Sequence, residues 1–134
     1  MFKRITCSTL RHATPALALI LMTGSPASAA PGAMSVATFL AKVAALRALG
    51  PAAVFSSDVN VLKQEGLAGA LAYKAQLEAE RKAGQPSSCP PDPPQVTGEE
   101  VIAQMNSYPA NMRGRILVRQ AFADVFRKRY PCHK

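Results

Sequence analysis

The segment CPPDPPQVTGEEVIAQMNSYPANMRGRILVRQAFADVFRKRYPC, residues 89–132, decides the fold of this chain. It starts with a proline-rich stretch, continues with a capped helix, breaks at Tyr108-Pro109 and ends with a basic amphipathic helix. Cysteines stand at both of its ends, so a disulfide between Cys89 and Cys132 would clamp the two helices as an antiparallel pair. We therefore predict a disulfide-closed helical hairpin over residues 89–132.

The first 29 residues have the composition of an export signal. Basic residues are followed by a short apolar run at 16–22 and by the small residues Ala27-Ser28-Ala29. The run is too short to cross a bilayer, which takes about 20 apolar residues, and no later stretch is expected to cross one. We predict a signal peptide at 1–29 with cleavage near Ala29. A single small helical domain at 30–134 follows, with a periplasmic or secreted location.

Cleavage at this site leaves two cysteines in the mature chain. Cys7 is removed with the signal, whereas Cys89 and Cys132 remain. Two cysteines in an oxidising compartment are usually paired. Closing so long a loop stabilises a fold by roughly 3–4 kcal/mol in the chain-entropy model. That is a large share of the total stability of a domain of this size.

Apolar residues recur at three- and four-residue steps, with no strand-like alternation, so the domain is predicted to be all-α. It should be a small bundle of about four helices. Their starts are marked by Ser35, by Ser57 and by the capping box Thr97-Gly-Glu-Glu100. The predicted helices cover residues 36–49, 58–83, about ten residues after Thr97, and about 112–130.

Two details of the N-terminal half concern packing. Val54 and Phe55, in the short connection after the first helix, are expected to lie under the core. Gly66 and Gly69 each cost up to about 1 kcal/mol relative to alanine inside a helix. We interpret these glycines as sites of close packing against another helix. A bend or a split of the long helix is the alternative.

The positive charge is concentrated at the C-terminus. Residues 113–134 carry seven basic side chains against Asp124, whereas residues 30–112 carry six basic and seven acidic ones. The excess is explained either by a solvated helix face or by a surface for an acidic partner. That partner would be a protein, an anionic lipid head group or an acidic polymer. Nucleic acid is a poor candidate, because the chain carries an export signal and offers no aromatic stacking platform.

No combination of residues for catalysis is visible in the sequence. After cleavage one histidine, His133, remains, and it neighbours a cysteine that the disulfide uses. No serine has a histidine–aspartate pattern around it, and no glycine-rich phosphate loop occurs. Glu99 and Glu100 are better explained by the capping box than as paired catalytic carboxylates. We therefore expect a protein that is not an enzyme and that has no cofactor and no metal site.

The C-terminal half resembles the Rap1a/Tai immunity proteins. The resemblance rests on the motifs CPP, VTGEEVI, YP, LVRQAF and RYPC, in this order, and covers residues 89–132. In that family a signal peptide precedes a small helical domain. Its C-terminal half starts at a Cys-x-Pro-like step, caps a helix with a polar residue, breaks near a proline and ends in aromatic-Pro-Cys. The family's N-terminal half usually carries another cysteine pair, and residues 30–88 have none.

The resemblance implies a periplasmic inhibitor that binds a peptidoglycan-cleaving amidase delivered by a type VI secretion system and blocks its active site. The positions carried over from the family belong to the scaffold. They are Cys89, Pro90, Thr97, Pro109, Pro131 and Cys132. For the contact with the protein partner we expect the exposed turn at 107–115 and the basic face. The candidate contact residues are Pro109, Asn111, Arg113, Arg115 and Arg119.

Two other functions remain open. One is a periplasmic stress chaperone resembling the acid-activated HdeA type, which is also small, helical and single-disulfide. Such proteins carry many carboxylates, and this chain has eight. The other is an envelope-associated module that binds anionic surfaces through the basic C-terminal helix. The sequence leaves open the identity of the partner, the oligomeric state and the continuity of the helix at 58–83.

Overall fold

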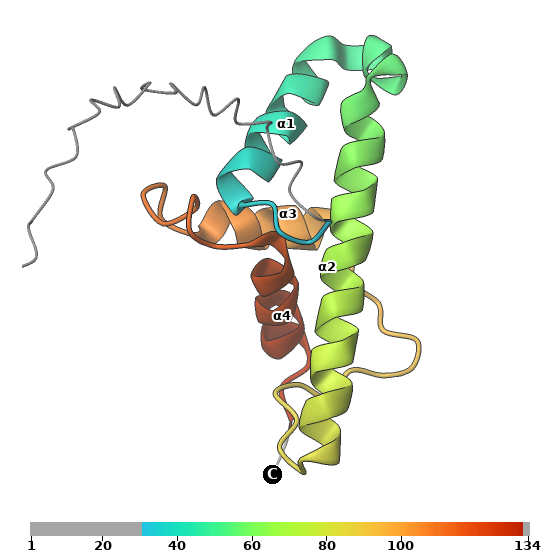
Figure 1. Cartoon of the computed structure of the whole chain (residues 1–134), viewed down its shortest axis with the longest axis vertical. Helices are drawn as coiled ribbons and strands as arrows, with labels where there is room; N and C mark the ends of the chain where they lie inside the picture. The colour runs from blue at the N-terminus through green and yellow to red at the C-terminus, as the bar shows by residue number, and fades with distance from the viewer. Residues whose placement is uncertain (1–30, 133–134) are drawn as a thin grey trace, which may run out of the picture.

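The computed structural model describes residues 31–132, and Figure 1 shows their arrangement. The predicted signal peptide with its cleavage site, Cys7 and His133 lie outside the described residues. Between residues 31 and 132 there are four α-helices and no strand, which confirms the prediction of an all-α bundle. The helices are α1 (Val36–Leu49), α2 (Ser57–Lys82), α3 (Gly98–Ser107) and α4 (Val118–Arg129). A 3₁₀ helix, η1 (Gly50–Phe55), joins α1 to α2.

The 26-residue helix α2 is the axis of the molecule. α1 runs back along its first half, α4 packs along its second half, and α3 lies across the bundle (Figure 1). α3 and α4, which the disulfide loop encloses, pack against each other. They cross, however, instead of running antiparallel as the sequence predicted. The reason is that α4 takes its direction from α2, against which it buries Ala123 and Phe126.

The hydrophobic core has two parts, and α4 contributes to both. The larger part lies where α1, α3 and α4 meet. It consists of Val36, Phe39, Val101, Met105, Val118, Ala121 and Val125. The smaller part joins α2 to α4 and consists of Tyr73, Leu77, Ala123 and Phe126. Phe122 packs against both parts, so this side chain connects them.

A glycine at position 69 lets α4 approach α2 closely. Gly69 is buried, and a Cβ atom there would stand 2.8 Å from Cδ2 of Phe122 and 3.3 Å from Cγ1 of Val118. The predicted close packing is therefore confirmed for Gly69. It is wrong for Gly66, where a Cβ atom would have nothing within 4 Å. Helix α2 is continuous through both glycines.

We predict that Gly69→Ala lowers the free energy of unfolding and that Gly66→Ala raises it. At position 69 the added methyl group must displace the ring of Phe122, and overpacking of this kind costs about 1–3 kcal/mol. At position 66 alanine adds helix propensity and restricts the unfolded chain, a gain of about 0.5–1 kcal/mol. Urea denaturation followed by circular dichroism measures both effects. Equal stability of the two variants would contradict the close approach.

Cys89 and Cys132 form the predicted disulfide, with Cα atoms 5.0 Å apart and a sequence separation of 43. The backbone N–H of Cys89 also donates to the carbonyl of Tyr130 at 2.8 Å. Next to the disulfide, Ser88 is fully buried, and its hydroxyl is hydrogen bonded to that of Tyr73. The end of α4 is therefore fastened to the proline-rich segment that follows α2.

Replacing both cysteines by serine should lower the free energy of unfolding by about 3–4 kcal/mol, because the unfolded chain gains the entropy of an open loop. Reductant should destabilise the unreplaced protein by a similar amount and should leave the Cys89→Ser/Cys132→Ser protein unchanged. Urea denaturation with and without reductant provides the comparison. If thiol labelling shows full reduction and stability does not change, the disulfide is not a main source of stability.

Helix α4 begins at Val118, not near residue 112 as the sequence predicted. The carbonyl groups of Arg113 and Ile116 accept hydrogen bonds from the first turn of α1, at 3.0 and 2.8 Å. These hydrogen bonds hold residues 113–116 against the start of α1 in a non-helical course. The residues before Val118 therefore form a loop that is tied to the start of α1.

The turn between α1 and α2 is exposed. The sequence predicts Val54 and Phe55 under the core, but these residues are 73% and 90% exposed. The prediction is wrong because η1 carries them past the end of α1, where η1 contacts only α1 and α2 among the described elements (Figure 1). The cap of α2 also differs by one residue. The hydroxyl of Ser56, and not that of Ser57, accepts from the first turn.

One described stretch has the length and composition of a membrane span. Val36–Phe55, which is α1 with η1, has 20 residues and a mean hydropathy of 1.4. It meets these criteria by length and composition only, so it does not overturn the prediction that no segment after the export signal crosses a bilayer. The α-helix is broken at Gly50, which has a φ of 55°, and Pro51 follows. One weakly apolar stretch of this kind does not make an integral membrane protein.

Candidate functional site

The candidate contact residues gather around one projecting loop. Residues 108–117, between α3 and α4, are called the 108–117 loop, and they stand out from the side of the bundle (Figure 1). The loop contains four of the five candidates, and the fifth lies in the first turn of α4. In chain order they are Pro109, Asn111, Arg113, Arg115 and Arg119. The fold therefore places all five in one region of the surface.

Arg113 belongs to the framework of the loop. Its side chain is half-buried; its Nε donates to the carbonyl of Tyr108 at 2.9 Å and its Nη2 to the carbonyl of Asn106 at 2.8 Å. The last carbonyl groups of a helix have no partner within the helix, so Arg113 satisfies the C-terminal end of α3. These contacts engage the guanidinium group, so Arg113 holds the loop in its conformation.

A half-buried tyrosine fastens the start of the loop to α4. The hydroxyl of Tyr108 donates to Oδ2 of Asp124 at 2.5 Å, and Oδ1 of the same carboxylate accepts from Arg127 at 2.9 Å. Burial, together with the hydrogen bond to Asp124, raises the pKa of Tyr108 to about 12. The phenol therefore stays protonated and continues to donate throughout the neutral pH range.

The end of the loop is tied to the N-terminal segment, which Glu65 holds in turn. An antiparallel bridge joins Leu117 to Ser35. The buried carboxylate of Glu65, in α2, accepts from the N–H groups of Gly32 and Met34 at 2.7 and 2.9 Å. Each oxygen of the carboxylate thus has a donor, as a buried charged group requires. The base of the loop is connected through this segment to α2.

Sequence reasoning missed the role of Glu65. The packing predicted for this helix concerned Gly66 and Gly69, and no buried carboxylate was expected. A signal was present, because Glu65, Gly69, Tyr73 and Leu77 follow one another at four-residue steps and therefore share one helix face. All four are buried. A carboxylate within such a series predicts a buried acceptor with backbone donors beside it.

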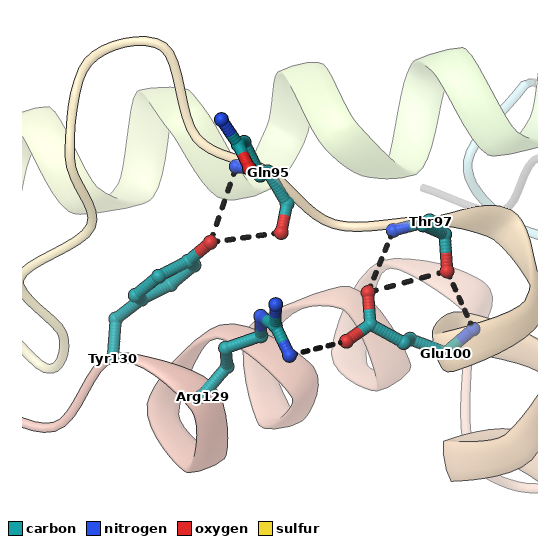
Figure 2. Close-up of polar contacts among 5 residues, drawn as sticks. All are labelled: Gln95, Thr97, Glu100, Arg129 and Tyr130. Atoms are coloured by element: carbon teal, nitrogen blue, oxygen red, sulfur yellow. Dashed lines mark hydrogen bonds and ion pairs between the residues drawn. The ribbon is translucent and has the colours of Figure 1, made fainter.

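The capping box at the start of α3 also anchors the end of α4, as Figure 2 shows. Glu100 accepts from the N–H of Thr97 at 2.8 Å, and Thr97 Oγ1 accepts from the N–H of Glu100 at 3.2 Å, which confirms the predicted box. Arg129 pairs with Glu100 at 2.7 Å, and the hydroxyl of Tyr130 donates to the carbonyl of Gln95 at 2.8 Å. The N–H of Thr97 and the charge of Arg129 hold the pKa of Glu100 below its usual value.

Part of the C-terminal positive charge is therefore engaged in contacts with other groups of the same protein. Arg127 and Arg129 form ion pairs with carboxylates at 2.9 and 2.7 Å, and Arg113 is engaged within the loop. Arg115 and Arg119 are exposed, and within residues 31–132 no ion pair involves them. These two arginines are the cations beside the loop that can meet a partner.

A polar hollow adjoins the 108–117 loop. It has a volume of about 330 Å³, and its lining includes Tyr108, Arg119, Asp124 and Arg127. Arg127 is paired with Asp124, so the exposed guanidinium group of Arg119 is the one that can meet a carboxylate there. A partner that covers the loop could place an acidic or amide side chain in this hollow.

Metal ligation has no support in the described part of the chain. Among residues 31–132, no three or more His, Cys, Asp or Glu side chains are placed together to hold a metal ion.

Comparisons with models of protein families, with curated proteins and with solved structures find no match. The relation to the Rap1a/Tai proteins therefore stays a prediction, carried by the motifs of residues 89–132.

We predict that Arg113→Gln loosens the 108–117 loop and that Arg115→Gln, the matched control, does not. Glutamine is too short to donate to both carbonyl groups, so the end of α3 loses its partner. The free energy of unfolding should fall by about 1–2 kcal/mol, and amide hydrogen exchange in the loop should become faster. Hydrogen–deuterium exchange measured by mass spectrometry compares the two variants. Equal exchange rates would show that Arg113 does not hold the loop.

Proposed function

We propose that this protein is an exported inhibitor that binds its partner through the 108–117 loop. We further propose that the partner is a secreted peptidoglycan amidase, as it is for the Rap1a/Tai immunity proteins. The observation that carries the proposal is a projecting loop whose backbone is held by hydrogen bonds at its start, middle and end. Such a loop can enter the cleft of a hydrolase without first having to be ordered.

The loop is ordered although it contains no regular secondary structure. Two turns shape it, since the N–H of Met112 donates to the carbonyl of Pro109 and the N–H of Arg115 donates to that of Met112, both at 2.9 Å. Residues 109–112 are exposed at its outer edge. Ordering these residues has taken place during folding, so little conformational entropy is left to lose on binding.

The charge of the loop region favours an acidic partner surface. Arg115 and Arg119 are exposed, and Arg119 lines the polar hollow. Charges at the rim of an interface mainly raise the association rate with an oppositely charged surface, and added salt weakens their effect. We therefore expect carboxylates around the partner's active-site cleft.

The positions that match the family motifs serve the placement of this loop. Cys89 and Cys132 fasten the end of α4, Thr97 caps the start of α3, and Pro109 follows Tyr108, the C-terminal cap of α3. These residues determine how α3 and α4 are placed, and hence where the loop between them projects. The identity of the partner is taken from the resemblance.

The proposed location agrees with the chemistry of the chain. A disulfide forms and persists in an oxidising compartment, and the apolar run near the N-terminus is compatible with export. A periplasmic inhibitor would meet the amidase in the compartment that contains its peptidoglycan substrate.

The alternatives predict different behaviour. The C-terminal helix offers fewer cations to an anionic surface than the sequence indicates, because Arg127 and Arg129 are paired with carboxylates. A stress chaperone of the HdeA type should prevent aggregation of an unfolding client protein at low pH, whereas an inhibitor of the proposed kind should not.

The test uses the mature protein and purified secreted peptidoglycan amidases, including any that a gene next to its own encodes. We expect the protein to stop peptidoglycan hydrolysis by at least one of them. Arg115→Glu/Arg119→Glu should bind about tenfold more weakly or worse, mainly through slower association, with an unchanged circular dichroism spectrum. Binding kinetics at low and high salt measure the effect.

The control for this experiment is Arg81→Glu/Lys82→Glu, which makes the same charge change in the last turn of α2 and should bind like the wild type. Full activity of every amidase in excess protein would contradict the proposed inhibition. Equal binding by the two double variants would remove the arginines beside the loop from the contact.

A further inference from the structure

The hairpin formed by α1, η1 and α2 ends in apolar side chains. Leu49, Val54 and Phe55, which are called the hairpin tip, are 51%, 73% and 90% exposed. Single exposed apolar residues are common on protein surfaces. Three of them lie around one reversal of the chain, and η1, which contains Val54 and Phe55, contacts neither α3 nor α4. They indicate a surface that meets something outside the chain.

The shape of the tip restricts what can cover it. The tip lies at the end of the molecule where the chain turns from α1 into α2 (Figure 1). It is a convex end, with helices on one side of it only. Two convex ends bury little area against each other, which disfavours a second copy of the chain. A soft surface that closes around a convex end, such as a lipid bilayer, suits this shape better.

The charges near the tip leave Arg47 as the cation beside it. Residues 36–57 include two basic side chains, Lys42 and Arg47, and no acidic one. The first carboxylate after the tip, Asp58, is paired with Lys42 at 2.6 Å, and the next, Glu65, is buried against backbone N–H groups. Asp58 therefore cancels the charge of Lys42, and Glu65 faces the protein, so neither pair adds a net charge beside the tip.

Arg47 is the cation next to the tip. It lies 3.7 Å from Glu99, and both side chains are largely exposed, so this pair contributes little. Its guanidinium group can exchange this contact for a phosphate, which it would bind through two hydrogen bonds.

The apolar stretch is suited to the interface of a bilayer and not to its interior. Helix α1 has 14 residues and is therefore about 21 Å long, which is shorter than the hydrocarbon core of about 30 Å. The break at Gly50 ends it. Peripheral binding needs only a few apolar side chains below the head groups, together with nearby cations.

We propose that the hairpin tip is a lipid-contact site through which the protein binds anionic phospholipid bilayers. Val54 and Phe55 insert below the head groups, and Arg47 stays at the level of the phosphates. The 108–117 loop lies elsewhere on the surface, so it remains free for a partner while the tip is bound. This site differs from the basic C-terminal helix, and it does not depend on the proposed inhibition of an amidase.

The first experiment places a reporter at the tip. The chain contains no tryptophan, so Phe55→Trp introduces a single one. With vesicles of phosphatidylglycerol and phosphatidylethanolamine, its emission should shift to the blue and be quenched by brominated acyl chains. Leu67→Trp replaces another apolar residue, 62% exposed on the side of α2, and should show neither change.

The second experiment measures binding by vesicle flotation. Val54→Ser/Phe55→Ser should lower the vesicle-bound fraction about tenfold or more, because most of the inserted apolar area is lost. Leu67→Ser/Leu71→Ser is the matched control and should bind like the wild type. All four side chains are exposed, so both variants keep the fold, which circular dichroism verifies. Vesicles of phosphatidylcholine alone should bind less of the wild-type protein.

Three results would overturn the proposal. One is unchanged flotation of Val54→Ser/Phe55→Ser, or unchanged emission of Phe55→Trp at saturating vesicle concentration. Another is a loss of vesicle binding only in Arg115→Glu/Arg119→Glu, which would assign lipid binding to the basic face near the loop. The third is a dimer in sedimentation that becomes a monomer with Val54→Ser/Phe55→Ser, which would assign the tip to a second copy.

Discussion

The approach of α4 to α2 at Gly69 is the contact on which the rest of the structure depends. Because position 69 has no side chain, the ring of Phe122 lies directly against the backbone of α2. Phe122 packs against both parts of the core, so fixing it fixes α4 relative to every other helix. The pairing of Arg129 with Glu100 then holds the start of α3 against the end of α4. The positions of α3 and α4 therefore determine where the 108–117 loop between them projects.

The parts of the fold that depend on residues close together in the sequence could be predicted from it. The capping box of Thr97 and Glu100 is a four-residue signal, and the disulfide follows from counting cysteines. The errors concern contacts between distant segments. The first turn of α1 holds residues 113–116 in a non-helical course, and no local pattern contains that information. Val54 and Phe55 have the composition of core residues, but the length of the hairpin carries them away from the core.

The candidate site could be located from the sequence, but the roles of its residues could not. Arg113, Arg115 and Arg119 are equivalent in a charge count. Only the fold shows that Arg113 donates to the end of α3 while the other two are exposed. Which cation is paired depends on the position of carboxylates and carbonyls brought from other elements. The chemistry of the partner is not contained in the fold at all, since a helical scaffold can present many surfaces.

If the chain is exported as we propose, the disulfide has a consequence for its passage across the membrane. In the reducing cytoplasm Cys89 and Cys132 stay thiols, so the precursor lacks about 3–4 kcal/mol of stabilisation out of the 5–15 kcal/mol typical of a whole domain. A precursor that folds weakly can be threaded through a translocation channel as an extended chain. Once oxidised on the far side, the same chain unfolds far less often. In the export that we propose, the crosslink would make passage across the membrane a one-way event, with folding completed at the destination.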